Sequence, residues 1–134
     1  MPRVHISIGI LLPALLAACG GGEADLVQPG TRPPNSVSIV SRAETKGTAA
    51  FAPNPLTIPL NGMVHWYNDD DAAAGGQYGG SNGTIHSLVA DDLSFVSENI
   101  IPGISFEHTF ATAGTYNYHC SIHPTMRGTI TVTP

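Results

Sequence analysis

The sequence has little charge: among its 134 residues, five are lysine or arginine and ten are aspartate or glutamate, which gives a net charge of −5. No run or stripe of basic residues occurs, and this excludes the electrostatic signature of a nucleic-acid-binding protein. The acidic balance instead favours a basic protein partner. With 134 residues, the chain has room for one domain and little more.

The chain also lacks a hydrophobic run long enough to cross a bilayer at its start. The apolar segment 6–18 has 13 residues, too few for a spanning helix but typical of a signal-peptide core. It ends in Leu-Ala-Ala followed by Cys19, which resembles a bacterial lipoprotein signal. We therefore expect a signal peptide at 1–18 and a lipidated Cys19 that anchors the protein to a membrane, facing the periplasm or the cell surface. The alternative is an ordinary secretory signal cleaved nearby.

Residues 19–35 are rich in glycine and proline and have almost no periodic apolar pattern. This composition is typical of a flexible linker. We expect the folded domain to occupy residues 36–134.

Helical periodicity is missing from the predicted domain, where short β-branched and aromatic runs alternate with turn residues. This pattern predicts an all-β fold, an antiparallel Greek-key β-sandwich. The expected strands are 37–40, a second region comprising Phe51 and 56–60, and then 63–67, 84–90, 104–110, 115–120 and 128–132. Prolines at positions 53, 55 and 59 favour sheet edges or bends. Tyr116 either makes the corner hydrogen bond of such sandwiches or is a plain buried aromatic.

Cysteine is scarce, with only Cys19 and Cys120. Their contexts argue against a disulfide, because Cys19 ends the apolar segment and Cys120 begins a cluster of metal-binding residue types. His123 follows three residues later and Met126 three beyond that. A thiolate, an imidazole and a thioether in one short loop are donors that copper selects, and a type 1 copper site uses a cysteine, two histidines and a weak axial methionine.

A second imidazole is therefore needed, and most other histidines can be excluded by their surroundings. His5 is removed with the signal peptide. His119 points away from Cys120, because neighbouring residues of a strand face opposite sides. His65 alternates with core residues and is expected to face solvent, while His108 shares a face with two phenylalanines and is expected to be packed.

His86 differs from these, since it follows a long glycine-rich segment and lies at the start of the predicted strand 84–90. We predict that His86 is the second equatorial ligand. The hydroxyl of Ser87 is expected to hydrogen-bond towards the cysteine loop and to hold the two ligand segments together.

Other interpretations fail on ligand count. A zinc finger needs more sulfur or histidine ligands, and a Cys-His nucleophile pair leaves Met126 unexplained. A binuclear copper centre needs a second cysteine in the loop, and a multicopper oxidase needs His-x-His pairs and a longer chain. A buried cysteine, histidine or methionine alone most often serves only to pack the core, but Cys120, His123 and Met126 together at this spacing favour copper.

The run from Gly114 to Gly128 resembles the C-terminal copper loop of cupredoxins, and its Cys-x-x-His-x-x-Met spacing is similar to that of the amicyanin type. Phe51-x-Pro and the segment 64–68 also resemble the middle of such domains, so the likeness covers residues 48–134. It implies one type 1 (blue) copper ion held by His86, Cys120, His123 and Met126. The loop 69–83 departs from the pattern in its length and is interpreted as a solvated loop or a docking feature.

The resemblance implies a one-electron carrier, not an enzyme, that shuttles electrons between redox partner proteins outside the cytoplasm. The expected exit is the edge of His123, surrounded by an apolar patch made of Ile122, Pro124, Ile101 and Pro102. Acidic residues 69–71, 91 and 92 are expected to steer a basic partner to a lipid-anchored monomer. The competing class is a copper protein for storage, delivery or sensing that does not shuttle electrons.

Overall fold

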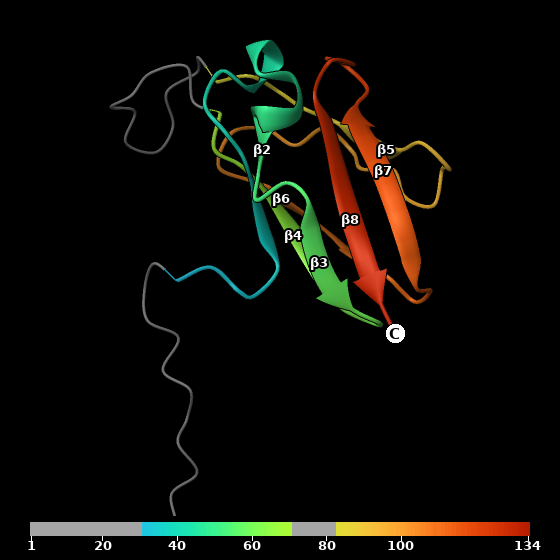
Figure 1. Ribbon diagram of the computed structural model, residues 1–134. Coiled ribbons are helices and arrows are strands. Elements are labelled where there is room, and N and C mark those ends of the chain that lie inside the picture. The colour runs from blue at the N-terminus through green and yellow to red at the C-terminus, as the bar shows by residue number, and fades with distance from the viewer. Residues whose placement is uncertain (1–30, 71–82) are drawn as a thin grey trace, which may run out of the picture. The chain divides into compact units, whose positions relative to one another are not determined.

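A computed structural model describes residues 31–70 and 83–134, and these form the domain shown in Figure 1. The compact unit runs from Arg32 to Pro134. The predicted signal peptide, the lipidation of Cys19 and most of the linker lie outside the described residues. No helix in the described part of the chain has the length and apolar character needed to cross a membrane.

Two four-stranded sheets make up the fold. The first has the strand order β2-β1-β4-β6, and the second has the order β3-β8-β7-β5. The strands are β1 (Ser36–Ile39), β2 (Phe51–Ala52), β3 (Leu56–Pro59), β4 (Met63–Asn68), β5 (Leu88–Ala90), β6 (Ser105–Thr109), β7 (Gly114–Cys120) and β8 (Arg127–Thr133), with two 3₁₀ turns, η1 (Ala43–Thr45) and η2 (Gly47–Ala50).

The β-sandwich is confirmed, but its sheets are mixed and not purely antiparallel. β1 pairs with β4 in parallel, and β3 pairs with β8 in parallel, while the other pairs are antiparallel. A parallel pair needs a long crossover, and the chain provides one between β1 and β4 through η1, η2, β2 and β3. Alternating patterns predict strands without predicting their direction, which is why the sequence did not reveal this.

One predicted strand is much shorter than expected. Only Leu88–Ala90 of the segment 84–90 forms a strand, and His86 makes an isolated bridge to Ile100. The backbone N–H of Thr84 instead donates a hydrogen bond to the carbonyl of Asp70, and the carbonyl of Thr84 accepts one from the side chain of Asn68. The start of this segment is therefore held by individual hydrogen bonds, not by a ladder.

Edge and corner features agree with the sequence. β2 and β3, which the prolines flank or end, are both edge strands. The hydroxyl of Tyr116 donates to the carbonyl of Thr112 at 2.9 Å. Of the two interpretations of Tyr116, the corner hydrogen bond is therefore confirmed.

Trp66 is central to the core between the sheets. Its ring is fully buried, and the ring centroid lies 5.3 Å from that of Phe95, 5.5 Å from that of Phe106, 6.4 Å from that of Phe110 and 5.6 Å from that of Tyr118. Because Trp66 belongs to β4 and Tyr118 to β7, their contact joins the two sheets. This rigid core positions the strand ends that carry the ligand candidates.

The loop between β7 and β8 lies at the same end of the sandwich as η1 and η2 (Figure 1). The hydroxyl of Thr125 in this loop donates to the carbonyl of Glu44 in η1 at 3.4 Å. Segments far apart in the sequence thus meet at one end of the domain.

Candidate metal centre

Three of the predicted ligands lie together at this end. The donor atoms of His86, Cys120 and His123 all lie within 4.8 Å of one another. The Cys120 Sγ atom is 3.7 Å from His86 Nδ1 and 3.7 Å from His123 Nδ1. His86 and Cys120 are fully buried, whereas His123 is half-buried. The fold therefore brings a thiol and two imidazole nitrogens to one point.

Backbone hydrogen bonds hold these residues in place. The N–H of Cys120 donates to the carbonyl of Met126 at 3.2 Å, and the N–H of Met126 donates to that of His123 at 3.0 Å, which closes a tight loop. The N–H of Ser121 donates to the carbonyl of Ser87 at 2.7 Å and ties the loop to the His86 segment. The ligand candidates are thus fixed through the main chain.

The prediction for the Ser87 hydroxyl was wrong. Its Oγ donates to the carbonyl of Ser97 at 3.3 Å, and it is the Ser87 carbonyl that joins the cysteine loop. The two segments are held together as predicted, but by a backbone group. A sequence cannot show which group makes such a contact, because every residue carries the same backbone donor and acceptor.

The electrostatics favour a thiolate. Burial by itself raises the pKa of the Cys120 thiol, but hydrogen bonds from His86, from the backbone of Ser87 and from His123 lower that pKa to about 6. Burial lowers the pKa of His86, while its hydrogen bonds to Cys120 and Asp70 outweigh burial and raise it. At neutral pH the thiol is thus mainly a thiolate, the form that binds metals.

The donor set and its spacing fit one copper ion. For a metal with the bond lengths of zinc, about 2.0 Å to nitrogen and 2.3 Å to thiolate sulfur, a trigonal angle places the two donor atoms about 3.7 Å apart. Both separations from Cys120 Sγ are 3.7 Å. Met126 is fully buried in the same loop, and the combination of thiolate, two imidazoles and a thioether is the one that type 1 copper uses.

The other histidines of the described chain lie outside this group. His119 hydrogen-bonds to Asp91 at 2.7 Å, and the ring of His108 packs against Phe95 and Phe110, where burial lowers its pKa. His119 was predicted to point away from Cys120 as a structural or surface residue, and His108 was predicted to be packed. His65 is more covered than predicted: its side chain is only 14% exposed and pairs with Glu107 at 2.9 Å.

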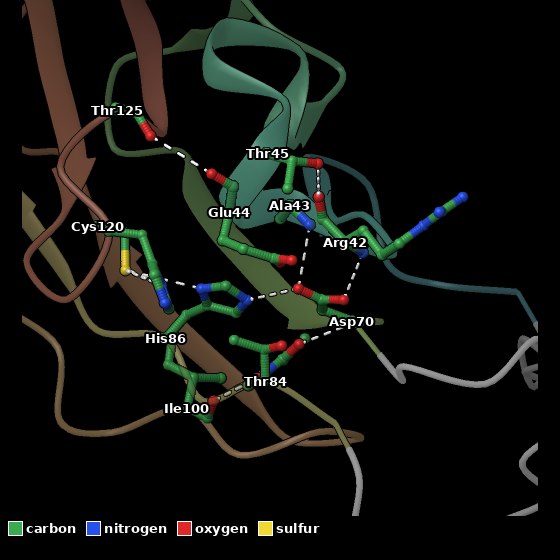
Figure 2. Close-up of polar contacts among 12 residues, drawn as sticks. Arg42, Ala43, Glu44, Thr45, Asp70, Thr84, His86, Ile100, Cys120 and Thr125 are labelled. Atoms are coloured by element: carbon green, nitrogen blue, oxygen red, sulfur yellow. Dashed lines mark hydrogen bonds and ion pairs between the residues drawn. The ribbon is translucent and has the colours of Figure 1, made fainter.

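Sequence reasoning missed one buried residue beside the site. Asp70, interpreted as part of a solvated or docking loop, is fully buried, and its Oδ2 lies 2.9 Å from His86 Nε2 (Figure 2). Its neighbour Asp69 pairs with Arg32 and accepts from Ser38, while Asp71 lies outside the described residues. The acidic run thus does not act as one feature. Three consecutive aspartates in a sequence do not indicate which of them is buried.

Comparison with known proteins decides the family. A family model for copper binding proteins of the plastocyanin/azurin family matches residues 38–133. The chain belongs to this family. A plastocyanin from Scenedesmus fuscus is 32% identical to this cupredoxin over 99 residues, which cover 64% of the chain and 89% of the plastocyanin. Copper is accordingly its cofactor.

Solved structures agree with the fold. A purple cupredoxin from Nitrosopumilus maritimus is 28% identical with a TM-score of 0.59, covering 73% of this cupredoxin and 98% of that chain. A Cu-containing nitrite reductase from Thermus scotoductus is 30% identical with a TM-score of 0.56, but the match covers 78% of this chain and only 23% of the enzyme. An amicyanin variant, 22% identical with a TM-score of 0.55 over 78% of this chain and 87% of its own, supports the fold alone.

Proposed function

We propose that this cupredoxin is a one-electron carrier in which His86, Cys120, His123 and Met126 hold a single type 1 copper ion. The observation that supports this most strongly is the arrangement of three donor atoms from two separate segments within 4.8 Å of one another. Copper supplies the redox chemistry by alternating between Cu(I) and Cu(II). The protein acts as a carrier and not as an enzyme.

The frame around the ligands serves this role because it resists rearrangement. His86 is bridged to Ile100 through two backbone hydrogen bonds, of 3.2 and 2.7 Å, and the cysteine loop is closed on itself. Ligands that are fixed in advance need to move little when the charge of the metal changes. A small rearrangement means a low barrier to electron transfer.

His123 provides a route for the electron to the surface. It is half-buried, whereas His86 and Cys120 are covered completely. Ile122 beside it is 47% exposed and Pro124 is exposed, and the proposed apolar rim also includes Ile101, which is 49% exposed. An apolar rim of this kind suits brief and weak docking of redox partners.

The partners in this proposal are redox proteins outside the cytoplasm, and the carrier is a monomer tethered through a lipid on Cys19. The support is the signal-like sequence 1–19 and the acidic charge of the chain. Mass spectrometry of the membrane-bound protein is expected to find the chain beginning at Cys19 with a lipid mass on it. An unmodified N-terminus further along the chain would refute the anchor.

Electron self-exchange tests the proposed carrier function directly. In samples that mix the Cu(I) and Cu(II) proteins, NMR line broadening is expected to show rapid exchange, and copper content should stay constant through repeated oxidation and reduction. Ile122→Asp, which puts a charge into the apolar rim, should slow exchange, while Leu93→Asp, at an exposed apolar residue of another loop, should not. Loss of copper on reduction, with no exchange, would favour storage or delivery.

A further inference from the structure

Asp70 is an acidic side chain buried directly behind a proposed copper ligand. Its Oδ2 lies 2.9 Å from Nε2 of His86, whose other nitrogen, Nδ1, is 3.7 Å from Cys120 Sγ. The imidazole thus lies between the carboxylate and the thiol, as Figure 2 shows. The side chains of Asp70 and His86 are 1% and 0% exposed, so water does not screen this contact.

The surrounding backbone holds the carboxylate as an acceptor. The N–H groups of Arg42 and Ala43 donate to Asp70 at 2.5 and 3.1 Å. Together with His86, three nitrogen donors surround one carboxylate, which has only acceptor atoms to offer them. Among residues 31–70 and 83–134, its one ion-pair partner is His86 and no lysine or arginine side chain pairs with it. The negative charge is therefore directed at the imidazole.

The position of Asp70 is also fixed from its own main chain. Its N–H donates to the side chain of Asn68 at 2.9 Å, and its carbonyl accepts from the N–H of Thr84 at 3.0 Å. Gly83 packs so closely here that an added Cβ would lie 2.8 Å from the Asp70 carbonyl oxygen and 2.2 Å from Pro102 Cγ. These contacts hold the main chain of Asp70 in place and so restrict the orientation of its carboxylate.

We propose that Asp70 is a positioning residue for His86, and that its buried charge stabilises Cu(II) over Cu(I) in this protein. This inference rests on the proposed copper site. By accepting the Nε2 proton, the carboxylate keeps that proton away from Nδ1, so the nitrogen beside Cys120 is free to bind metal. A negative charge in a buried site attracts the ion with the larger positive charge more strongly. The carboxylate therefore stabilises the oxidised state more than the reduced state, and this lowers the reduction potential.

Glu44 offers a matched comparison for the effect of charge alone. Its Oε2 atom is buried and has no hydrogen-bond partner among the described residues. Figure 2 shows the side chain pointing into the space beside His86. Glu44→Gln therefore removes one nearby negative charge without removing a hydrogen bond to a ligand. Asp92, which is fully exposed, provides the same charge change at the surface.

The test is a spectroelectrochemical titration of the copper-loaded protein and three variants. Asp70→Asn is expected to raise the reduction potential, with the preference for Cu(II) over Cu(I) falling about tenfold, which equals about 59 mV for one electron. Glu44→Gln should give a smaller rise, and Asp92→Asn should leave the potential unchanged. A potential in Asp70→Asn equal to that of the wild type, or a rise matched by Asp92→Asn, would overturn the proposal.

A measurement on the wild type covers the case in which Asp70→Asn does not fold. In NMR spectra of the Cu(I) protein, the Nε2 proton of His86 is expected to be visible at neutral pH and to exchange slowly, because Asp70 accepts it in a buried site. Rapid exchange would refute the positioning role. A wild-type protein without a thiolate-to-copper absorption band would instead refute the copper site itself, so the two failures are distinguishable.

Discussion

Replacing Cys120 with serine is expected to abolish the intense visible absorption that appears when Cu(II) is added to the protein. The band arises from charge transfer between the thiolate and copper, and a serine hydroxyl is not ionised at neutral pH. Cys120 is fully buried and its pKa is lowered to about 6, so the wild-type thiolate is ready to bind. The affinity for Cu(II) should fall by more than about 100-fold, beyond the 10–100-fold loss typical when a group that only orients a ligand is removed. Visible spectra and copper titrations measure both effects.

His119→Ala is the matched control for this substitution. His119 precedes Cys120 in the chain, but its side chain is 25% exposed and pairs with Asp91. The variant should therefore retain the full band and bind copper with unchanged affinity. A band that persists in Cys120→Ser, or a wild-type complex that is colourless, would contradict the type 1 site.

Replacing Trp66 with alanine is expected to lower the free energy of unfolding by about 3–5 kcal/mol, the range for truncating a large buried aromatic residue. The ring is fully buried and contacts four other aromatic rings, among which Phe106 belongs to β6 in its own sheet and Tyr118 to β7 in the other sheet. Since small domains are stable by only about 5–15 kcal/mol, this loss would remove a large part of the stability. Urea denaturation followed by circular dichroism measures this loss. Tryptophan fluorescence is not suitable, because the variant lacks the only tryptophan of the chain.

Leu93→Ala serves as the control, since the side chain of Leu93 is 73% exposed. Its unfolding free energy should stay within about 0.5 kcal/mol of the wild type. The unfolding free energy of Trp66→Phe should lie between those of Trp66→Ala and Leu93→Ala, because the smaller phenylalanine ring still fills part of the space. An alanine variant as stable as Leu93→Ala would show that the Trp66 cluster does not hold the sheets together.

The loop residues could be predicted because they are neighbours in sequence. Cys120, His123 and Met126 lie within seven positions, so their spacing already limits how far apart they can be in space. His86 was selected by excluding the other histidines and by its position after the glycine-rich segment, and the structure places its Nδ1 3.7 Å from Cys120 Sγ. The strand positions were also largely predictable, because hydrophobic alternation is a local property.

The pairing of strands and the environment of Asp70 were beyond such reasoning. β1 meets β4, and β3 meets β8, through contacts between residues far apart in the chain. Asp70 is 16 positions from His86 and 27 from Ala43, yet it hydrogen-bonds to both. Nothing in a run of three aspartates indicates which one is buried.

The order of the amino acids is enough to predict the donor chemistry, namely a thiolate, an imidazole and a thioether in one short loop and a second imidazole at His86, together with the β-sandwich that carries them. Packing of the two sheets is needed to show which backbone groups hold the ligand candidates and that the buried carboxylate of Asp70 lies behind His86. The physical reason is that donor type and strand pattern depend on each residue and its near neighbours. Burial and hydrogen-bond partners depend instead on segments that meet only when the two sheets pack.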